Sequence, residues 1–282
     1  MLLVADSGST KCDWIVIENG KAGTKLSTGG FNPNFCDAAF ILDELNAKEG
    51  LADIRNKVKF IRFFGSGCSG PARNAIVSQP LQSFFPKADV EVHHDVLGAA
   101  LATCGDQPGI SCIIGTGCNA SLFDGKDVVP NNFGLGYVLA DEGSGTYLGK
   151  KLITAYLYDT LPAKLRSDFS SRYLLDRESV IEHVYSKPRA NIWLASFAAF
   201  LSEHSSEAWV SKTVSKGFQD FFDLYICSQK DYRNLPASFV GSVAFGFREL
   251  LHEVASENGV TIGKIIRYPI EGLADYYSNR SF

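Results

Sequence analysis

The sequence lacks a basic excess, a long apolar run and any low-complexity tract. Lys and Arg number 27 against 31 Asp and Glu, so the formal charge is −4, which argues against a general nucleic-acid binder. No stretch approaches the roughly 20 apolar residues that a membrane helix needs, so we expect no membrane partner. Residues 1–6 reach an acid without a basic region, which predicts a cytoplasmic protein without a signal peptide. The hydrophobic content of 45% excludes disorder as the dominant state.

Metal-binding spacings are also missing. The seven cysteines are spread along the chain, and they include no C-x-x-C pair. This distribution is typical of a reducing compartment, in which cysteines serve as small buried hydrophobes. The five histidines form no H-x-x-x-H pair, so a structural zinc site is not expected.

Apolar runs alternate with polar turns and helical patterns, which predicts an α/β fold. The best candidate boundary is 106–109, after which the opening pattern of strand, small-residue turn and strand recurs. The turn at 115–117 then corresponds to the turn at 6–8, as in a duplicated two-domain fold. Most of the chain after residue 144 has helical spacing.

Three small-residue turns follow apolar strands, at 6–11, 115–119 and 241–242. Such turns expose backbone N–H groups that can hold phosphate oxygens, and glycine lets a ligand approach closely. Neither a G-x-x-x-x-G-K-[ST] loop nor a G-x-G-x-x-G fingerprint is present. Each turn alone is typical of a plain hairpin, while the three together favour a phosphate clamp. The residues predicted for the clamp are Asp6, Ser7, Gly8, Ser9, Thr10, Lys11, Gly115, Thr116, Gly117, Cys118, Gly241 and Ser242.

Two aspartates stand at the ends of predicted strands. A carboxylate at Asp6 beside bound phosphate would need a cation to neutralise the charge, and Mg²⁺ held largely through water would supply it. The alternative is that Asp6 is simply a turn former. Asp95 follows the strand 90–94 and precedes a helix. It is either the N-cap of that helix or a general base next to a substrate hydroxyl. At most one of His93 and His94 shares its surroundings, because neighbouring strand residues point to opposite faces.

The segment 134–146 is the densest in glycine and capping residues. Asp141 and Glu142 stand between its glycines, and Ser144 is expected to cap the helix that follows. A backbone of this kind can wrap closely around a ligand, and the two acids could accept hydrogen bonds from sugar hydroxyls. The alternative is a helix N-terminus enriched in acids by the helix dipole.

These motifs resemble those of the N-acetylglucosamine kinase branch, grouped with the BadF/BadG/BcrA/BcrD ATPases, of the sugar kinase, Hsp70 and actin superfamily. Residues 6–11 resemble the first phosphate motif, usually D-G-G-G-T-K, and 115–119 resemble the second, usually G-T-G-S. Residues 136–144 are close to the family's G-W-G-Y-x-x-G-D-E-G-S, and 240–244 resemble the adenosine motif.

The resemblance implies an α/β fold of two ribonuclease-H-like domains, as in the actin-like ATPases, flanking a nucleotide cleft. The N-terminal domain would span 1–106, with a C-terminal helix at about 270–282 packing back on it. The C-terminal domain would span 107–269 and carry helical insertions. ATP and Mg²⁺ would be the cofactors, with Mg²⁺ near Asp6, and the family analogy allows a homodimer.

The resemblance also implies roles for single residues. Asp95 falls where the family has its catalytic base, in a pattern usually written N-D-A, although His94 replaces the asparagine. Ser7 and Ser9 replace glycines of the first phosphate motif. The G-F-N-P-N sequence at 30–34 leaves open which asparagine meets the sugar. Sugar contacts are expected at Asn32, Asn34, Ser69, Gly70, Asp95, Thr116, Asp141 and Glu142.

The leading hypothesis is therefore an ATP-dependent kinase of an N-acetylhexosamine or related amino sugar, with O6 of N-acetylglucosamine the expected acceptor. One alternative is an ATPase activator of a radical dehydratase or reductase, whose 4Fe–4S cluster could involve Cys104 and Cys118. Another is a non-catalytic nucleotide-binding regulator.

Overall fold

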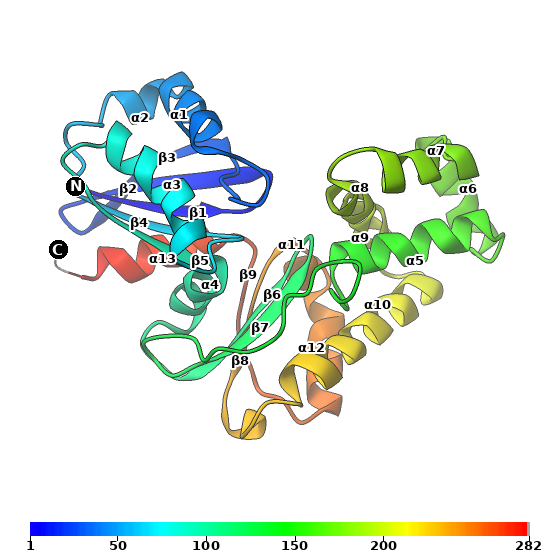
Figure 1. Cartoon of the computed structure of the whole chain (residues 1–282). Coiled ribbons are helices and arrows are strands. Elements are labelled where there is room, and N and C mark those ends of the chain that lie inside the picture. Colours follow the sequence, from blue (N-terminus) through cyan, green and yellow to red (C-terminus); the bar gives the residue numbers. More distant parts are fainter. Residues whose placement is uncertain (281–282) are drawn as a thin grey trace. The chain divides into compact units, whose positions relative to one another are not determined.

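The computed structural model describes residues 1–280, and the chain divides into two units (Figure 1). Unit 1 comprises Met1–Gln107, Asp124–Val128 and the described residues from Tyr268 onward. Unit 2 comprises Pro108–Phe123 and Val129–Arg267. This division differs from the expected one at a hairpin tip, 124–128, which groups with unit 1. The end of the expected last helix, 281–282, lies outside the described residues.

Unit 1 is built on a five-stranded sheet in the order β3-β2-β1-β4-β5. Its strands are β1 (Leu2–Ser7), β2 (Lys11–Glu18), β3 (Lys21–Gly29), β4 (Phe60–Gly65) and β5 (Asp89–His94). β1, β2 and β3 are successively antiparallel, while β4 and β5 continue the sheet parallel to β1. Asn19 and Gly20 between β2 and β3 both have positive φ, as a two-residue type I′ turn requires. The Asn-Gly turn predicts a strand after it, but residues 21–25 form no apolar run and are exposed, so the turn is the one local signal for β3.

Helices cover both faces of this sheet (Figure 1). Those on one face are α1 (Ala38–Ala47), α2 (Glu49–Ala52) and α3 (Pro71–Phe84), and those on the other are α4 (Asp95–Cys104) and α13 (Pro269–Ser278). Trp14, Phe31 and Phe63 fill the core under α1 and α3. On the opposite face the Phe64 ring lies 6.3 Å from that of Tyr277 on α13. The strand ends at Ser7, Gly65 and His94 are thereby held at one edge of a rigid sheet.

Unit 2 is built on a four-stranded sheet in the order β7-β6-β8-β9. Its strands are β6 (Gly109–Ile114), β7 (Cys118–Phe123), β8 (Ala237–Val240) and β9 (Ile262–Ile266). β6 and β7 form an antiparallel hairpin, and β8 lies parallel to β6, as β4 does to β1. The turns at 8–10 and 115–117 therefore occupy matching positions, each joining the first two strands of a mixed sheet. The expected correspondence of 115–117 with 6–8 is wrong by two residues, because Asp6 and Ser7 belong to β1. The predicted α/β class is confirmed.

Most of the remainder of unit 2 is helical. Its helices are α5 (Gly145–Leu157), α6 (Ala163–Arg172), α7 (Arg177–Ile181), η1 (Glu182–Ser186), α8 (Ala190–Ser196), α9 (Ala198–Glu203), α10 (Ala208–Phe221), η2 (Phe222–Ile226), η3 (Tyr232–Asn234), α11 (Ser242–Gly246) and α12 (Arg248–Glu257). The helical spacing of residues 243–258 predicts one continuous helix, but the structure has two, α11 and α12. Phe247 leaves helical geometry, with φ −117° and ψ 31°, and buries its ring in the core between α11 and α12. No helix of the described residues is both long and apolar enough to traverse a lipid bilayer.

Candidate active site

Asp95 is the first residue of α4 and directly follows β5. The interpretation of Asp95 as the N-cap is wrong, because His94 caps the helix: its Nδ1 accepts the N–H of Leu97 at 3.3 Å. The Asp95 carboxylate instead accepts hydrogen bonds from the Ser66 hydroxyl and the Val96 N–H. Burial nevertheless raises the pKa of Asp95 above its ordinary value. A buried carboxylate at a strand end, poised to take a proton, has the properties of a general base.

Asp6 lies on β1 opposite Asp13 of β2. Burial raises the pKa of Asp6 to about 7, and the nearby carboxylates of Asp95 and Asp13 contribute. The Lys11 ammonium lies 2.8 Å from Asp13 Oδ1, so this lysine pairs with Asp13. A buried carboxylate surrounded by other carboxylates suits a hard cation such as Mg²⁺. Within residues 1–280 no group of three or more His, Cys, Asp or Glu side chains could hold a metal ion, so a cation here would need further ligands from water or phosphate.

The side chains of Ser7 and Ser9 fix the turn between β1 and β2 by hydrogen bonds. The Gly8 N–H donates to the Lys11 carbonyl at 3.0 Å. Ser7 Oγ accepts the Phe31 N–H at 2.9 Å, and Ser9 Oγ accepts from Asn32 Nδ2 at 2.8 Å. The Ser7 side chain and the Gly8 N–H, both predicted to hold phosphate, are therefore engaged within unit 1. In the described part of the chain, the N–H groups of Ser9 and Thr10 donate to no protein acceptor.

The two asparagines of the 30–34 segment have different surroundings. Asn32 is 4% exposed, and its Oδ1 accepts the Asn34 N–H at 2.9 Å while its Nδ2 is bound to Ser9. Asn34 is exposed. A Cβ on Gly67 would lie 2.3 Å from Asn32 Oδ1 and 2.8 Å from Asn34 Nδ2, so only glycine fits there. Of the two, Asn34 is the one whose side chain is open to a ligand.

The loop after β4 supplies the other predicted contacts of unit 1. Ser69 is exposed, and its Oγ accepts from the Arg73 guanidinium at 3.1 Å. Gly70 precedes α3 in an extended conformation, and a Cβ there would meet no atom within 4 Å. Ser66, whose hydroxyl reaches Asp95, belongs to the same loop but carries no motif that reveals it in the sequence.

The turn between β6 and β7 is closed in a similar way. The Gly115 N–H donates to the Gly117 carbonyl at 2.9 Å, and the Cys118 N–H donates to Asp141 Oδ1 at 3.0 Å. Among the residues that the structure describes, no protein group accepts the N–H of Thr116 or Gly117. Two adjacent backbone donors in a glycine turn can bind an anion such as a phosphate.

Asp141 and Glu142 both bond inside unit 2. Asp141 is 7% exposed and has a positive φ of 72°. A Cβ on Gly117 would lie 2.8 Å from Asp141 Oδ2, so the close approach of turn and carboxylate requires glycine. Glu142 Oε2 accepts from the Tyr225 hydroxyl at 2.7 Å. These contacts give both acids a part in shaping the turn. The predicted cap at Ser144 is confirmed, since its Oγ accepts the Tyr147 N–H at 3.2 Å.

Substitution of Asp141 tests this scaffolding contact. Asp141→Ala leaves the buried Cys118 N–H without its acceptor, so we expect the free energy of unfolding to fall by about 1–3 kcal/mol. Asp141→Asn keeps an oxygen in place and should stay near the wild type. Chemical denaturation measures the difference. If Asp141→Asn is as damaging as Asp141→Ala, the charge of Asp141 is needed and the hydrogen bond alone does not explain the residue.

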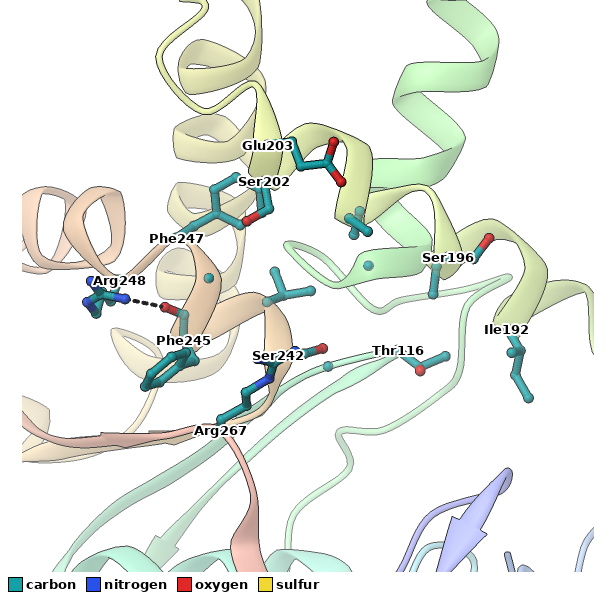
Figure 2. Close-up of a pocket in the computed structure, with 17 residues that line it drawn as sticks. Thr116, Ile192, Ser196, Ser202, Glu203, Ser242, Phe245, Phe247, Arg248 and Arg267 are labelled. Atoms are coloured by element: carbon teal, nitrogen blue, oxygen red, sulfur yellow. Dashed lines mark hydrogen bonds between the residues drawn. The ribbon is translucent and has the colours of Figure 1, made fainter. Parts of the chain in front are cut away.

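A pocket of about 640 Å³ opens beside this turn in unit 2 (Figure 2). Gly115 and Thr116 line it from the turn, and Ser242 lines it from the start of α11. Phe245 and Arg248 flank it, with the guanidinium 5.3 Å above the ring. Its volume is that of a typical small-molecule site. The remaining lining residues are Gly145, Ile192, Ala195, Ser196, Ala198, Ala199, Ser202, Glu203, Val243, Gly246, Phe247 and Arg267.

Glycines bring the walls of this pocket together. A Cβ on Gly149 would lie 1.9 Å from the Leu194 carbonyl oxygen, so α5 and α8 touch backbone to backbone. One turn earlier, a Cβ on Gly145 would lie 3.1 Å from Ala195 Cβ. Gly241 has φ 126°, and a Cβ there would lie 2.4 Å from the Ile114 carbonyl oxygen. No sequence motif identifies α8 and α9 as walls of the pocket, although the G-x-x-x-G spacing of 145 and 149 is a signal for close helix packing.

Comparisons with known proteins agree with this architecture. The structure of a candidate N-acetylglucosamine kinase from Porphyromonas gingivalis is 38% identical, with 99% of each chain covered and a TM-score of 0.94. One from Chromobacterium violaceum is 16% identical, with 98% of each chain covered and a TM-score of 0.62. A ROK-family glucokinase from Streptomyces griseus, solved with glucose and AMPPNP, is 14% identical over 98% of this chain and 97% of that one, with a TM-score of 0.54. No family model matches the chain, and no curated protein matches it. The predicted ribonuclease-H-like, actin-like ATPase fold is confirmed.

Proposed function

The chain belongs to the family of the candidate N-acetylglucosamine kinase from Porphyromonas gingivalis, and on this premise we propose that it is an ATP-dependent sugar kinase. The proposed acceptor is an N-acetylhexosamine, with O6 of N-acetylglucosamine the first choice. The proposal places the chain in the branch grouped with the BadF/BadG/BcrA/BcrD ATPases. A cytoplasmic location, a homodimer and the absence of nucleic-acid and membrane partners stay predictions.

One observation carries the proposal: Gly115 and Thr116 of the turn at 115–117 line the pocket of unit 2, and the adjacent N–H groups of Thr116 and Gly117 donate to no protein acceptor among the described residues. Thr116 and Gly117 would bind phosphate oxygens, and the pocket beside them has room for a nucleoside. Ser242 would contribute from the start of α11. The Streptomyces griseus relative of the same fold was solved with an ATP analogue, which supports a nucleotide as ligand.

Unit 1 would bind the sugar that accepts the phosphoryl group. Asn34, Ser69 and Gly70 are proposed to contact the sugar, since all three lie on neighbouring loops and none is buried. Asp95 would accept the proton of the sugar hydroxyl as that oxygen attacks the γ-phosphorus of ATP. Ser66 and the Val96 N–H hold the carboxylate in place. The N–H groups of Ser9 and Thr10 would donate to the phosphate oxygens that gain charge in the transition state.

Asp6 is proposed to hold Mg²⁺ through water. The bound ion would neutralise phosphate charge during transfer. Asp6 suits this role because burial and the carboxylates of Asp13 and Asp95 make its own negative charge costly without a cation. Lys11, proposed for the phosphates, is held by Asp13 at 2.8 Å.

The test is release of ADP from Mg·ATP with a panel of amino sugars and hexoses. Stimulation by one sugar establishes the kinase and names its substrate. Slow hydrolysis that no sugar changes contradicts the proposal and favours the activator or regulator hypotheses. Anaerobically purified protein with an absorbance band near 400 nm would then identify the activator.

The activity should depend on pH through Asp95 and Asp6, because both carboxylates must be charged and burial raises the pKa of each; Ser66→Ala separates the part due to Asp95. The base must be charged, so activity is present above its pKa and lost as the pH falls through it. Because burial raises that pKa, the acidic limb of kcat/KM should lie above the ordinary 3.8 of an aspartate. Ser66→Ala removes a hydrogen bond to the charged form and should move the limb to still higher pH. Direct quantification of ADP across pH checks both; a limb that Ser66→Ala leaves in place would contradict the assignment to Asp95.

A further inference from the structure

The two serines of the first phosphate turn stand where the resembled motif has glycine, and each makes a specific bond. Ser7 Oγ accepts the Phe31 N–H at 2.9 Å, and Ser9 Oγ accepts from Asn32 Nδ2 at 2.8 Å. The partners are consecutive residues of a segment more than twenty positions away. The serine side chains therefore join the turn to the 30–34 segment.

The backbones of the turn and the segment are also in close contact. A Cβ on Gly30 would lie 2.3 Å from the Gly8 carbonyl oxygen and 2.7 Å from the Thr10 nitrogen. At that separation a shift of the turn cannot be absorbed by side chains and must move the segment. The absence of a side chain at Gly30 thus allows the two backbones to be in direct contact.

Asn32 extends this contact to Asn34, which is proposed to bind the sugar. Its Oδ1 accepts the Asn34 N–H at 2.9 Å and lies against Gly67, while its own carbonyl accepts the Phe35 N–H at 2.9 Å. One buried amide therefore holds the phosphate turn with its nitrogen and the exposed Asn34 with its oxygen. Each end of the Asn32 amide makes one bond within unit 1, and the side chain is only 4% exposed, so its surroundings favour a structural role over contact with a ligand.

We propose that Asn32 is a positioning residue that couples the first phosphate turn, through Ser9, to the 30–34 segment that carries the proposed sugar contact Asn34. This proposal rests on the proposed function, and it replaces the expectation that Asn32 itself touches the sugar. Phosphate bound at Ser9 and Thr10 orders the turn, and the Ser9–Asn32 bond transmits that order to Asn34. By reciprocity, a sugar on Asn34 raises the affinity for the nucleotide.

The first readout is amide hydrogen exchange of residues 30–36, with Mg·AMPPNP binding monitored separately by calorimetry. In the wild type we expect bound nucleotide to slow exchange of this segment about fivefold or more. Ser9→Ala removes the bond and should abolish the slowing. Ser9→Thr keeps a hydroxyl and should restore it. Ser9→Gly, the usual residue of the resembled motif, should behave as Ser9→Ala does and guards against a folding defect.

The second readout is the affinity for Mg·AMPPNP with and without saturating N-acetylglucosamine. The wild type should bind the nucleotide about five- to tenfold more tightly with the sugar, and Ser9→Ala should show no such gain. If Ser9→Ala still shows slower amide exchange with bound nucleotide and tighter nucleotide binding with the sugar, the coupling is overturned. The kinase assignment is left intact by that result. Absence of AMPPNP binding in the wild type overturns the proposed function, and the coupling with it.

Discussion

Replacement of Asp95 by asparagine is expected to lower kcat by about 10²- to 10⁴-fold, the usual contribution of a general base. Asparagine preserves the shape and an acceptor oxygen for Ser66 and the Val96 N–H, but it cannot take a proton. The affinity for Mg·ATP should stay nearly unchanged. The measurement is ADP release with the best sugar of the panel, together with calorimetry of nucleotide binding.

Asp89→Asn is the matched control, since Asp89 begins the same strand β5 that ends next to Asp95. Its carboxylate is 61% exposed and pairs with Arg62 at 3.2 Å. An exposed pair of this kind contributes little, so kcat should stay at the wild-type value. Strong residual turnover in Asp95→Asn would refute the assignment of the base, and a loss in Asp89→Asn would show that the effect is not specific to the site.

Gly149→Ala is expected to destabilise unit 2 by about 2–3 kcal/mol, although glycine to alanine in a helix usually stabilises by about 1 kcal/mol. The sign reverses because the new Cβ would lie 1.9 Å from the Leu194 carbonyl oxygen, a backbone atom that no side-chain rotation can move away. α8 must then move away from α5. Since Ile192, Ala195 and Ser196 of α8 line the pocket, nucleotide affinity should fall about tenfold, equivalent to about 1.4 kcal/mol.

Urea denaturation followed by tryptophan fluorescence measures this loss, because Trp193 lies on α8 itself. Thr154→Ala on the exposed side of α5, the helix that carries Gly149, is the control, and its free energy of unfolding should change by no more than about 0.7 kcal/mol. If Gly149→Ala proves as stable as the wild type, α5 and α8 can separate without cost and the tight helix crossing does not support the pocket.

Much of the fold can be predicted from the sequence because its signals are local. The Asn19-Gly20 turn, the Ser144 cap and the strands around the two glycine turns depend on residues a few positions apart. The repeated strand–turn–strand pattern likewise indicates two α/β units. By contrast, the length of β3 has no local signal beyond that turn, because the first half of the strand is exposed and polar and is held by its pairing with β2.

The features of the candidate site likewise separate into those that the sequence indicates and those that only the tertiary structure reveals. By itself the sequence determined which turns carry glycine and that Asp6 and Asp95 lie close to strand ends, because small residues and apolar runs are visible in the order of residues. The structure places Asp6 inside β1, one residue before its end, and Asp95 at the start of α4. Only the tertiary structure decided that His94 takes the cap and that Asn32 is enclosed while Asn34 is open. The same holds for the pocket walls on α8 and α9. The physical reason is that burial and hydrogen-bond partners depend on segments far apart in the chain.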